Sequence, residues 1–379
     1  MEMRMKWIVS LLLCIPVLSA IGADQHSQHF IQTNHGTSVE IIATYSIVGW
    51  DSLTGDLGVA VQSRFLGVGA VVPYAKAGVG AIATQAFANT TFGPKGLELL
   101  GQGRDPQDVV NMLVQSDSDA ANRQLGVVDA RGNAFAYTGA SCQSYAGHII
   151  GKGYSVQGNI LANETVVKAI ARTFELSTGD LADRLLAALD AGEKAGGDKR
   201  GRQSAALLVV RDKGGYGGYN DRLIDIRVDD DSLPLVELRR IYNLWQSTFL
   251  MEARFRTIDE FNAQRNFSAA REETKRAVDL LNAEIRRKPD DPEALNSVAW
   301  TLATHNIDGV RALELVQRAA KLAPDKTYIR DTMAECHFRL GHLDEAIAIE
   351  AELVTKDPSN DAYWKQLKKF REAKLNPGH

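Results

Sequence analysis

Residues 44–63, TYSIVGWDSLTGDLGVAVQS, decide the fold of the first half of the chain. Two runs of β-forming residues, 44–48 and 57–63, flank a turn cluster of Asp, Ser, Thr and Gly at 51–56. Apolar runs bounded by turn residues are typical of two strands joined as a hairpin. The stretch therefore predicts an antiparallel strand pair at the start of a β-rich domain.

The segments that follow this pair come in blocks of strands and blocks of helices. Further strands are predicted at 67–73, 78–86, 125–129, 134–138, 154–157, 205–210 and 223–228, the last as an edge strand. Helices are predicted after Gly93-Pro94, after Asp105-Pro106 with Asp105 as the N-cap, and around 166–174 and 181–189. Such blocks argue against a doubly wound parallel sheet. They favour an α+β fold in which helices cover antiparallel sheets.

Composition divides the chain in two. Of the 32 glycines among 379 residues, 29 lie before residue 246, whereas 43 of the last 134 residues are charged. Glycine suits tight turns and close approach of strands, and charge suits solvent-exposed helices. The net charge is -4, the pI is near 6.1, and the sequence has no basic stripe. We therefore expect no nucleic-acid partner.

The N-terminus has the features of a secretory signal over residues 1–23. Arg4 and Lys6 precede an apolar stretch at 7–18, and small residues follow at 20–23. No later segment has about 20 consecutive apolar residues, so we expect no transmembrane anchor and an exported protein, periplasmic or extracellular. Residues 24–43 are polar and predict a pro-segment or flexible arm.

The cysteines indicate no metal site. Cys142 and Cys336 fall in different predicted domains, 44–240 and 241–379, so a disulfide between them is not expected. No CxxC pair or Cys/His cluster has the spacing of a zinc site. We therefore predict neither a metal nor a cofactor.

A 34-residue period marks the last third of the chain. Pro324 and Pro358 are 34 residues apart, and Ala312 and Ala346 each lie twelve residues before them. This pattern resembles tetratricopeptide repeats, well over 327–360 and less well over 293–326, which lacks a Gly at the turn between its helices. Residues 250–289 are helical but too degenerate to assign. Such helices usually bind a peptide or protein partner. Alternatively, they cover the first domain or mediate self-association into a homo-oligomer.

The first domain carries a hydroxyl at the start of its first strand, a basic residue about thirty positions later and a Gly-rich strand after that. N-terminal nucleophile hydrolases need this combination. In these enzymes cleavage makes a Thr, Ser or Cys the first residue, and its own α-amino group serves as the general base. Thr44 is the candidate for the hydroxyl, and Lys76 is the candidate for the basic residue.

Several stretches of this domain resemble the DUF1028 family. They are TYSIVG at 44–49, GVAVQSRF at 58–65, VGAVVP at 68–73, AGVGAIATQ at 77–85, LGVVD at 125–129, QGN at 157–159 and GGDKRGRQSAA at 196–206. The fold of that family is similar to the N-terminal nucleophile hydrolases. The resemblance implies a four-layer αββα sandwich over residues 44–240, followed by the all-α repeat domain over 241–379.

The resemblance also implies a site. As catalytic residues it suggests Thr44, Lys76, Gln85, Asp198 and Ser204; as substrate-binding residues it suggests Ser63, Arg64, Asn89, Gln157, Asn159, Arg202 and Gln203. Lys76 would lower the pKa of the Thr44 hydroxyl, and the backbone at 84–86 would bind the oxyanion. The chain departs from the proteasome-like branch of the N-terminal nucleophile hydrolases at one position. Gln62 stands where that branch has an acidic residue.

Two functions follow as expectations. The first is an exported hydrolase that cleaves an amide bond of a small amide or peptide, with Thr44 as nucleophile. Because Thr44 follows Ala43, this activity requires cleavage between them. The second is a catalytically silent binding or scaffold protein of the cell envelope that presents the repeat helices to a partner.

Overall fold

The computed structural model describes residues 30–32, 38–40 and 44–376. Residues 1–41 and 42–379 form two compact units. In the first, β1 (Phe30–Gln32) and β2 (Ser38–Glu40) pair antiparallel, within the segment predicted as a pro-segment or arm. The predicted signal, 1–23, lies outside the described residues.

A six-stranded antiparallel sheet contains the stretch that opened the sequence analysis. Its order is β12-β11-β4-β3-β10-β9, made of β3 (Thr44–Trp50), β4 (Leu57–Ser63), β9 (Gly147–Gly151), β10 (Tyr154–Gly158), β11 (Ser204–Val210) and β12 (Arg222–Val228). β3 and β4 pair with Thr44 opposite Ser63, so the predicted hairpin is confirmed. β12 is one of the two edge strands of this sheet, as its alternating pattern predicted.

The second sheet has four antiparallel strands in sequence order. They are β5 (Pro73–Lys76), β6 (Gly80–Ala86), β7 (Arg123–Asp129) and β8 (Ala134–Thr138). The predicted strand at 67–73 is wrong. Gly67 has a left-handed backbone (φ 67°), and Val68–Ala70 form a 3₁₀ turn whose first N–H donates to the Ser204 hydroxyl. That contact from β11 ends the extended run, so β5 begins only at Pro73. β9 was not predicted.

The two sheets pack face to face through small and β-branched side chains. Val48, Val59 and Val61 of the larger sheet meet Ala81 and Ala83 of the smaller one in a common core. Burial of this apolar surface stabilises the contact between the sheets, at about 25 cal/mol per Å².

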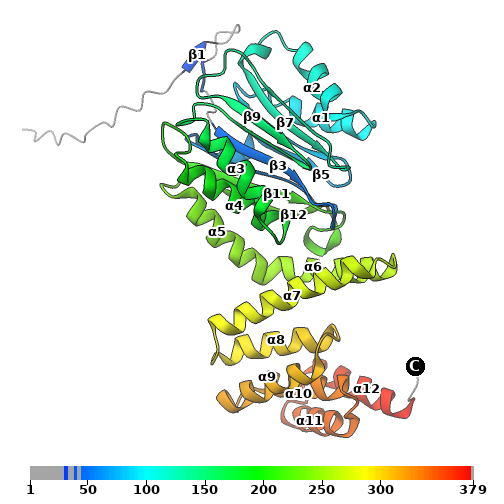
Figure 1. Ribbon diagram of the computed structural model, residues 1–379. Helices are drawn as coiled ribbons and strands as arrows, with labels where there is room; N and C mark the ends of the chain where they lie inside the picture. Colours follow the sequence, from blue (N-terminus) through cyan, green and yellow to red (C-terminus); the bar gives the residue numbers. More distant parts are fainter. Residues whose placement is uncertain (1–29, 33–37, 41–43, 377–379) are drawn as a thin grey trace, which may run out of the picture. The chain divides into compact units, whose positions relative to one another are not determined.

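Helices cover the outer faces of both sheets. α1 (Phe92–Gly101) and α2 (Pro106–Gln115) lie on the four-stranded sheet, and α3 (Thr165–Leu176) and α4 (Leu181–Lys194) lie on the six-stranded sheet (Figure 1). The Asp105 side chain caps α2 as predicted, accepting from the Gln107 N–H. The result is the αββα layer order that the family resemblance implied.

The predicted domain boundary at 240/241 falls inside a helix. α5 (Pro234–Trp245) packs Leu238 and Tyr242 into the core under β11 and β12. It continues through a π-helical segment, Gln246–Leu250, into α6 (Met251–Ala263). The chain therefore passes from sandwich to helical array without a linker.

The remaining helices form consecutive antiparallel pairs. They are α7 (Phe267–Arg287), α8 (Pro292–Thr304), α9 (Gly309–Leu322), α10 (Thr327–Arg339), α11 (Leu343–Lys356) and α12 (Asp361–Leu375). Residues with positive φ sit at the turns α6–α7, α8–α9 and α10–α11: Arg265 (58°), Asn306 (53°) and Gly341 (79°). Asn tolerates this conformation better than most residues. Asn306 therefore takes the place of the Gly that 293–326 lacks.

Six charged side chains join the sandwich to α6 and α7, and this group is called the junction network below. It comprises Asp56, Asp180, Arg211, Arg254, Glu273 and Arg276. Arg211 donates to both Asp56 oxygens at 2.6 and 2.7 Å, and Arg254 Nη1 lies 2.7 Å from Glu273 Oε1. Burial alone would lower the pKa of Arg211, but the carboxylates beside it raise that pKa above its usual value. The guanidinium therefore stays charged.

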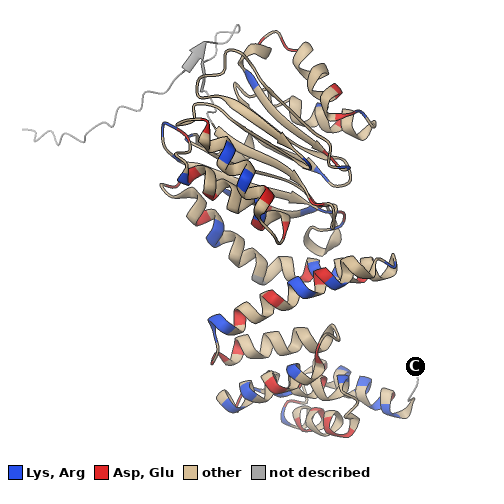
Figure 2. Cartoon of the chain, viewed as in Figure 1, with Lys and Arg blue, Asp and Glu red and all other residues tan. Residues whose placement is uncertain are grey.

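Charge is distributed as the composition indicated. Figure 2 shows Lys, Arg, Asp and Glu dense on the helices and sparse on the strands.

Among the described residues, no helix is long and apolar enough to cross a membrane.

Candidate functional site

Three hydroxyl side chains form one row across the end of the six-stranded sheet. Ser63 of β4 lies opposite Thr44 of β3 on one side and opposite Ser204 of β11 on the other, and all three are fully buried. Side chains two residues along these strands, such as Val61 and Ala206, belong to the core between the sheets. Because strand side chains alternate between faces, the row points into the inter-sheet space.

Thr44 and Ser63 are directly bonded. The Thr44 hydroxyl donates to Ser63 Oγ at 3.0 Å. Ser204 is used differently: its hydroxyl accepts from the Val68 N–H at 3.1 Å and donates to the Phe65 carbonyl. It therefore anchors the β4–β5 connection, and its described contacts are with Val68 and Phe65 rather than with Thr44.

Gln85 of β6 crosses from the smaller sheet to Thr44. Its amide N–H groups donate to the Thr44 carbonyl (3.3 Å), to Gln124 Oε1 (2.8 Å) and to the Gln157 carbonyl (3.3 Å). Its oxygen accepts from the Ser46 hydroxyl at 2.6 Å. The predicted residue is thus at the site, but it contacts the main chain of Thr44 and not its hydroxyl.

Asn159 and Gln157 of the β10 segment complete this group. The Asn159 N–H donates to the Thr44 carbonyl at 3.0 Å, and its side-chain N–H donates to Gln124 Oε1 at 2.9 Å. Gln157 Nε2 donates to Ser46 Oγ at 2.6 Å. Gln85, Gln124, Gln157, Asn159 and Ser46 are all buried, and they are called the amide network below.

Sequence reasoning missed Ser46 and Gln124, and also Ser155, which donates to Gln157 Oε1 at 2.8 Å. The sequence carried a signal for Ser46 and Ser155. Ser46 follows Thr44 by two residues, and Ser155 precedes Gln157 by two, so each pair shares a face of an otherwise apolar strand. Polar residues at period two on a buried strand indicate a polar patch inside the core.

Asp198 holds the loop 198–203 against the end of β4. Its carboxylate accepts from the Arg64 N–H at 3.1 Å and the Arg200 N–H at 2.9 Å, and it pairs with the Arg200 guanidinium at 3.0 Å. These bonds place Asp198 beside Arg64, next to the end of β4. They also direct the carboxylate to the loop and to Arg64, so its described contacts do not include Thr44.

The other predicted loop residues lie around the same strand end. Arg64 follows Ser63 and is half-buried. Gln203 donates its N–H to the Ser63 carbonyl at 2.9 Å and its side-chain amide to Asp230 at 3.0 Å. Arg202 is exposed and pairs with Glu193 at 2.9 Å.

Asn89 lies in a separate cluster at the end of β6. It donates to Asp117 Oδ2 at 2.8 Å, and Arg123 Nε reaches the same oxygen at 2.9 Å. Burial would raise the pKa of Asp117, but the bonds from Arg123 and Asn89 hold that pKa below its usual value. Because Arg123 and Gln124 are adjacent, this cluster borders the amide network without being part of it.

Among the described contacts, none joins Lys76 to Thr44. Lys76 is the last residue of β5, is exposed, and pairs with Gly80 at the start of β6. Thr44 is contacted from Gln85, five residues further along β6, which is about 17 Å at the rise of a strand. The lysine–threonine pair therefore stays a prediction, and the contacts described around Thr44 come from other residues.

Gln62 occupies the opposite face of β4 from Ser63. It is fully buried, and neither its amide nitrogen nor its amide oxygen has a hydrogen-bond partner among the described residues. It lies in register with Tyr45 and Ala205, which belong to the core under α3 and α4. The position that departs from the proteasome-like pattern therefore faces away from the site.

The described part of the chain contains no group of three His, Cys, Asp or Glu side chains arranged to hold a metal ion. Cys142 and Cys336 are free thiols. Burial raises the pKa of Cys142 to about 11 and that of Cys336 to about 12, so neither thiol is ionised near neutral pH.

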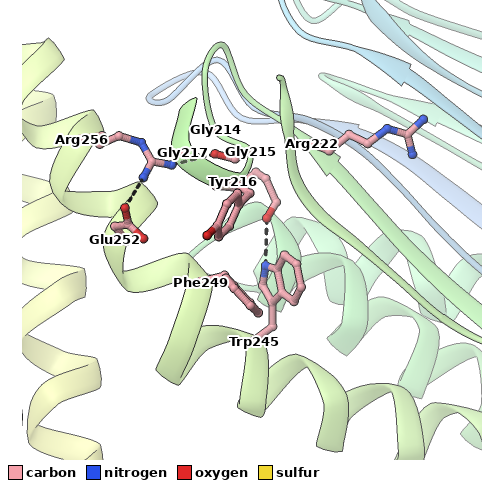
Figure 3. Close-up of a pocket in the computed structure, with 10 residues that line it drawn as sticks. Gly214, Gly215, Tyr216, Gly217, Arg222, Trp245, Phe249, Glu252 and Arg256 are labelled. Carbon is pink, nitrogen blue, oxygen red and sulfur yellow. Dashed lines mark hydrogen bonds and ion pairs between the residues drawn. The ribbon is translucent and has the colours of Figure 1, made fainter. Parts of the chain in front are cut away.

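A small pocket lies elsewhere, between the Gly214–Gly217 loop and the α5–α6 junction. Figure 3 shows Tyr216, Phe249 and Trp245 packed against one another in it, with Trp245 Nε1 donating to the Leu223 carbonyl at 2.9 Å. Arg256 donates to the Gly215 carbonyl at 2.8 Å. None of the predicted site residues lines this pocket.

The fold and the site define a class: an α+β sandwich of two antiparallel sheets between helices, joined to an array of paired helices. Residues 44–238 match the family described as "Family of unknown function (DUF1028)", and residues 308–369 match the tetratricopeptide repeat. The chain belongs to the DUF1028 family.

Two known proteins share parts of this chain. The crystal structure of protein SPO2555 from Silicibacter pomeroyi, a DUF1028 protein, is 32% identical, with a TM-score of 0.51, over 55% of this chain and 92% of that chain. A TPR repeat-containing protein, PA4667, from Pseudomonas aeruginosa is 34% identical over 77 residues, which are 20% of this chain and 13% of that protein. This chain thus spans about an eighth of that curated relative.

Proposed function

We propose that this protein is an exported amide-bond hydrolase that uses Thr44 as an N-terminal nucleophile once residues 1–43 are removed. One observation carries the proposal: Thr44 is the first residue of β3, and its hydroxyl bonds Ser63 Oγ at 3.0 Å where polar residues of both sheets converge. The family match also begins at residue 44.

The chemistry requires only the residue itself as base. The free α-amine of Thr44 takes the hydroxyl proton as Oγ1 attacks the carbonyl carbon of the substrate amide. The amine then gives that proton to the leaving nitrogen as the C–N bond breaks, which leaves an ester on Oγ1. Water attacks the ester with the amine again as base, and release of the acid restores the hydroxyl.

Gln85 and Asn159 have a positioning role in this scheme. Both donate to the Thr44 carbonyl, at 3.3 and 3.0 Å, and therefore fix the main chain on which the amine and the hydroxyl are carried. Holding reacting groups in one geometry removes an entropic barrier from the chemical step. Lys76 has no role in this proposal.

The uncleaved chain is an inactive precursor under this proposal. The Thr44 nitrogen is then an amide, which is not basic, and the side chain is fully buried. Removal of residues 1–43 turns this nitrogen into a free amine and so supplies the base.

Intact-mass measurement and N-terminal sequencing of the purified, exported protein test the proposal. We expect a chain that begins at Thr44 and that a β-lactone probe acylates on the Thr44 peptide. Thr44→Ala should abolish labelling, whereas Thr54→Ala, in the partly exposed β3–β4 turn, should not. A chain that retains residues 24–43 under all conditions, or labelling that survives in Thr44→Ala, would contradict the proposal.

A second candidate is a catalytically silent binding or scaffold protein of the cell envelope. The distance of Lys76 from Thr44 and the commitment of Asp198 and Ser204 to loop contacts favour it. Tetratricopeptide-like repeats suggest protein interaction. An unprocessed, unlabelled chain that binds a partner through residues 292–375 would support this candidate.

A further inference from the structure

Four basic side chains surround the end of β4, and they are called the basic rim below. Arg64 directly follows the last residue of the strand, and Lys199, Arg200 and Arg202 come from the loop 198–203. The loop is held to the strand by the bonds of Asp198 and by the Gln203 N–H, which donates to the Ser63 carbonyl. The rim is therefore fixed one residue away from Ser63, the partner of Thr44.

Two members of the rim are already paired. Arg200 bonds the Asp198 carboxylate and also donates to the Arg64 carbonyl at 2.9 Å. Arg202 pairs with Glu193 at 2.9 Å. These two cations stabilise the loop and are neutralised by their partners.

Arg64 is different. Its main chain is held on both sides, by Asp198 at the N–H and by Arg200 at the carbonyl. Its guanidinium has no ion-pair or hydrogen-bond partner among the described side chains, and it passes over Gly201, with Nη1 3.5 Å from the position of a Cβ there. Gly201 leaves room for this arginine. A half-buried, backbone-anchored guanidinium without a partner loses little entropy when an anion binds.

We propose that the substrate carries a free carboxylate, which Arg64 binds while Thr44 attacks an amide bond of the same molecule. This substrate class rests on the proposed function. The planar guanidinium matches a carboxylate with two parallel hydrogen bonds, which gives orientation as well as affinity. Lys199, exposed beside Arg200, adds positive potential at the same rim.

A matched pair of substrates tests the proposal on the purified chain. Glutaryl anilide and pentanoyl anilide have the same five-carbon length and differ in the terminal carboxylate. We expect glutaryl anilide to be cleaved with a kcat/KM about tenfold or more higher. Arg64→Gln should remove the preference, and Arg64→Lys should keep part of it. Arg104→Gln, an exposed arginine of the α1–α2 connection, is the control and should change neither rate.

Calorimetry separates failure of this inference from failure of the hydrolase. Glutarate has no amide bond, and 1,5-pentanediol is its neutral counterpart of equal length. If glutarate binds, the diol does not, and Arg64→Gln abolishes the binding of glutarate, the carboxylate site is supported even if neither anilide is cleaved. Equal cleavage of both anilides would overturn the carboxylate site and leave the hydrolase standing. Absence of glutarate binding would also overturn it.

Discussion

The amide network and the junction network bury polar groups in different ways. The amide network, beside Thr44, consists of neutral side chains that both donate and accept, so Gln85 alone links Thr44, Ser46, Gln124 and Gln157. The junction network, around Arg211, consists of three arginines and three carboxylates that must be paired by charge. The neutral side chains of the amide network can hold a reactive residue in place without favouring one charge state of that residue. The ionic network instead fixes one arrangement of helices on the sandwich.

Removal of one carboxylate from the junction network should produce the largest effect. Glu273→Ala leaves Arg211 and Arg254, both buried, without a shared partner. Breaking a buried ion pair from one side costs about 3–5 kcal/mol. Urea unfolding should show this loss. Glu272→Ala, whose side chain is 43% exposed and sits one residue earlier, should cost at most about 1 kcal/mol. Equal losses in the two variants would show that the network is not a source of stability.

An apolar replacement in the amide network should produce a smaller loss. Gln85→Leu removes the donors to Thr44 and Gln124 and the acceptor for Ser46. We expect about 2–3 kcal/mol of destabilisation, because buried polar groups are left unpaired. Thr84→Val is the control, since the Thr84 hydroxyl makes one long bond of 3.4 Å and the new side chain keeps its shape. A Gln85→Leu variant as stable as Thr84→Val would contradict the linking role of Gln85.

The repeat helices contain a buried carboxyl that is not paired with a base. Glu350 of α11 is fully buried beside Asp331 and Glu335 of α10, and Lys369 of α12 pairs with Glu335 at 2.6 Å instead. Burial, with the charge of Asp331, raises the pKa of Glu350 from 4.5 to about 8. Between these pH values the folded chain keeps a proton that the unfolded chain has lost, so stability falls as pH rises through this window.

Thermal melts followed by helical circular dichroism at pH 6 and pH 9 measure this effect. Glu350→Gln should reduce the fall in Tm between the two conditions by on the order of 5 °C, the smallest of the three effects. Glu345→Gln, exposed on the same helix, should leave the fall unchanged. An identical pH dependence in all three proteins would mean that Glu350 does not titrate in this window.

Local patterns predicted most of the fold. The turn cluster at 51–56 defined the β3–β4 hairpin, and the 34-residue spacing of Pro324 and Pro358 defined the repeats. One exception depended on a distant partner: the 3₁₀ turn at 68–70 is held by Ser204, more than 130 residues away, and that contact leaves no mark on the local sequence. The turn at Asn306 is local and has the positive φ of a glycine turn without the glycine.

The candidate site likewise combines features that the sequence predicted with features that only the tertiary structure decided. The sequence by itself determined that Thr44 begins the first strand and that polar residues recur on buried strands, because these are properties of order and period along the chain. Only the tertiary structure decided which of them meet: it joined Thr44 to Ser63, Gln85 and Asn159, and it placed Lys76 at the end of β5, opposite the start of β6. The physical reason is strand register. A shift of a few residues in where β5 starts moves a side chain by many ångströms, and that register is set by packing between the sheets.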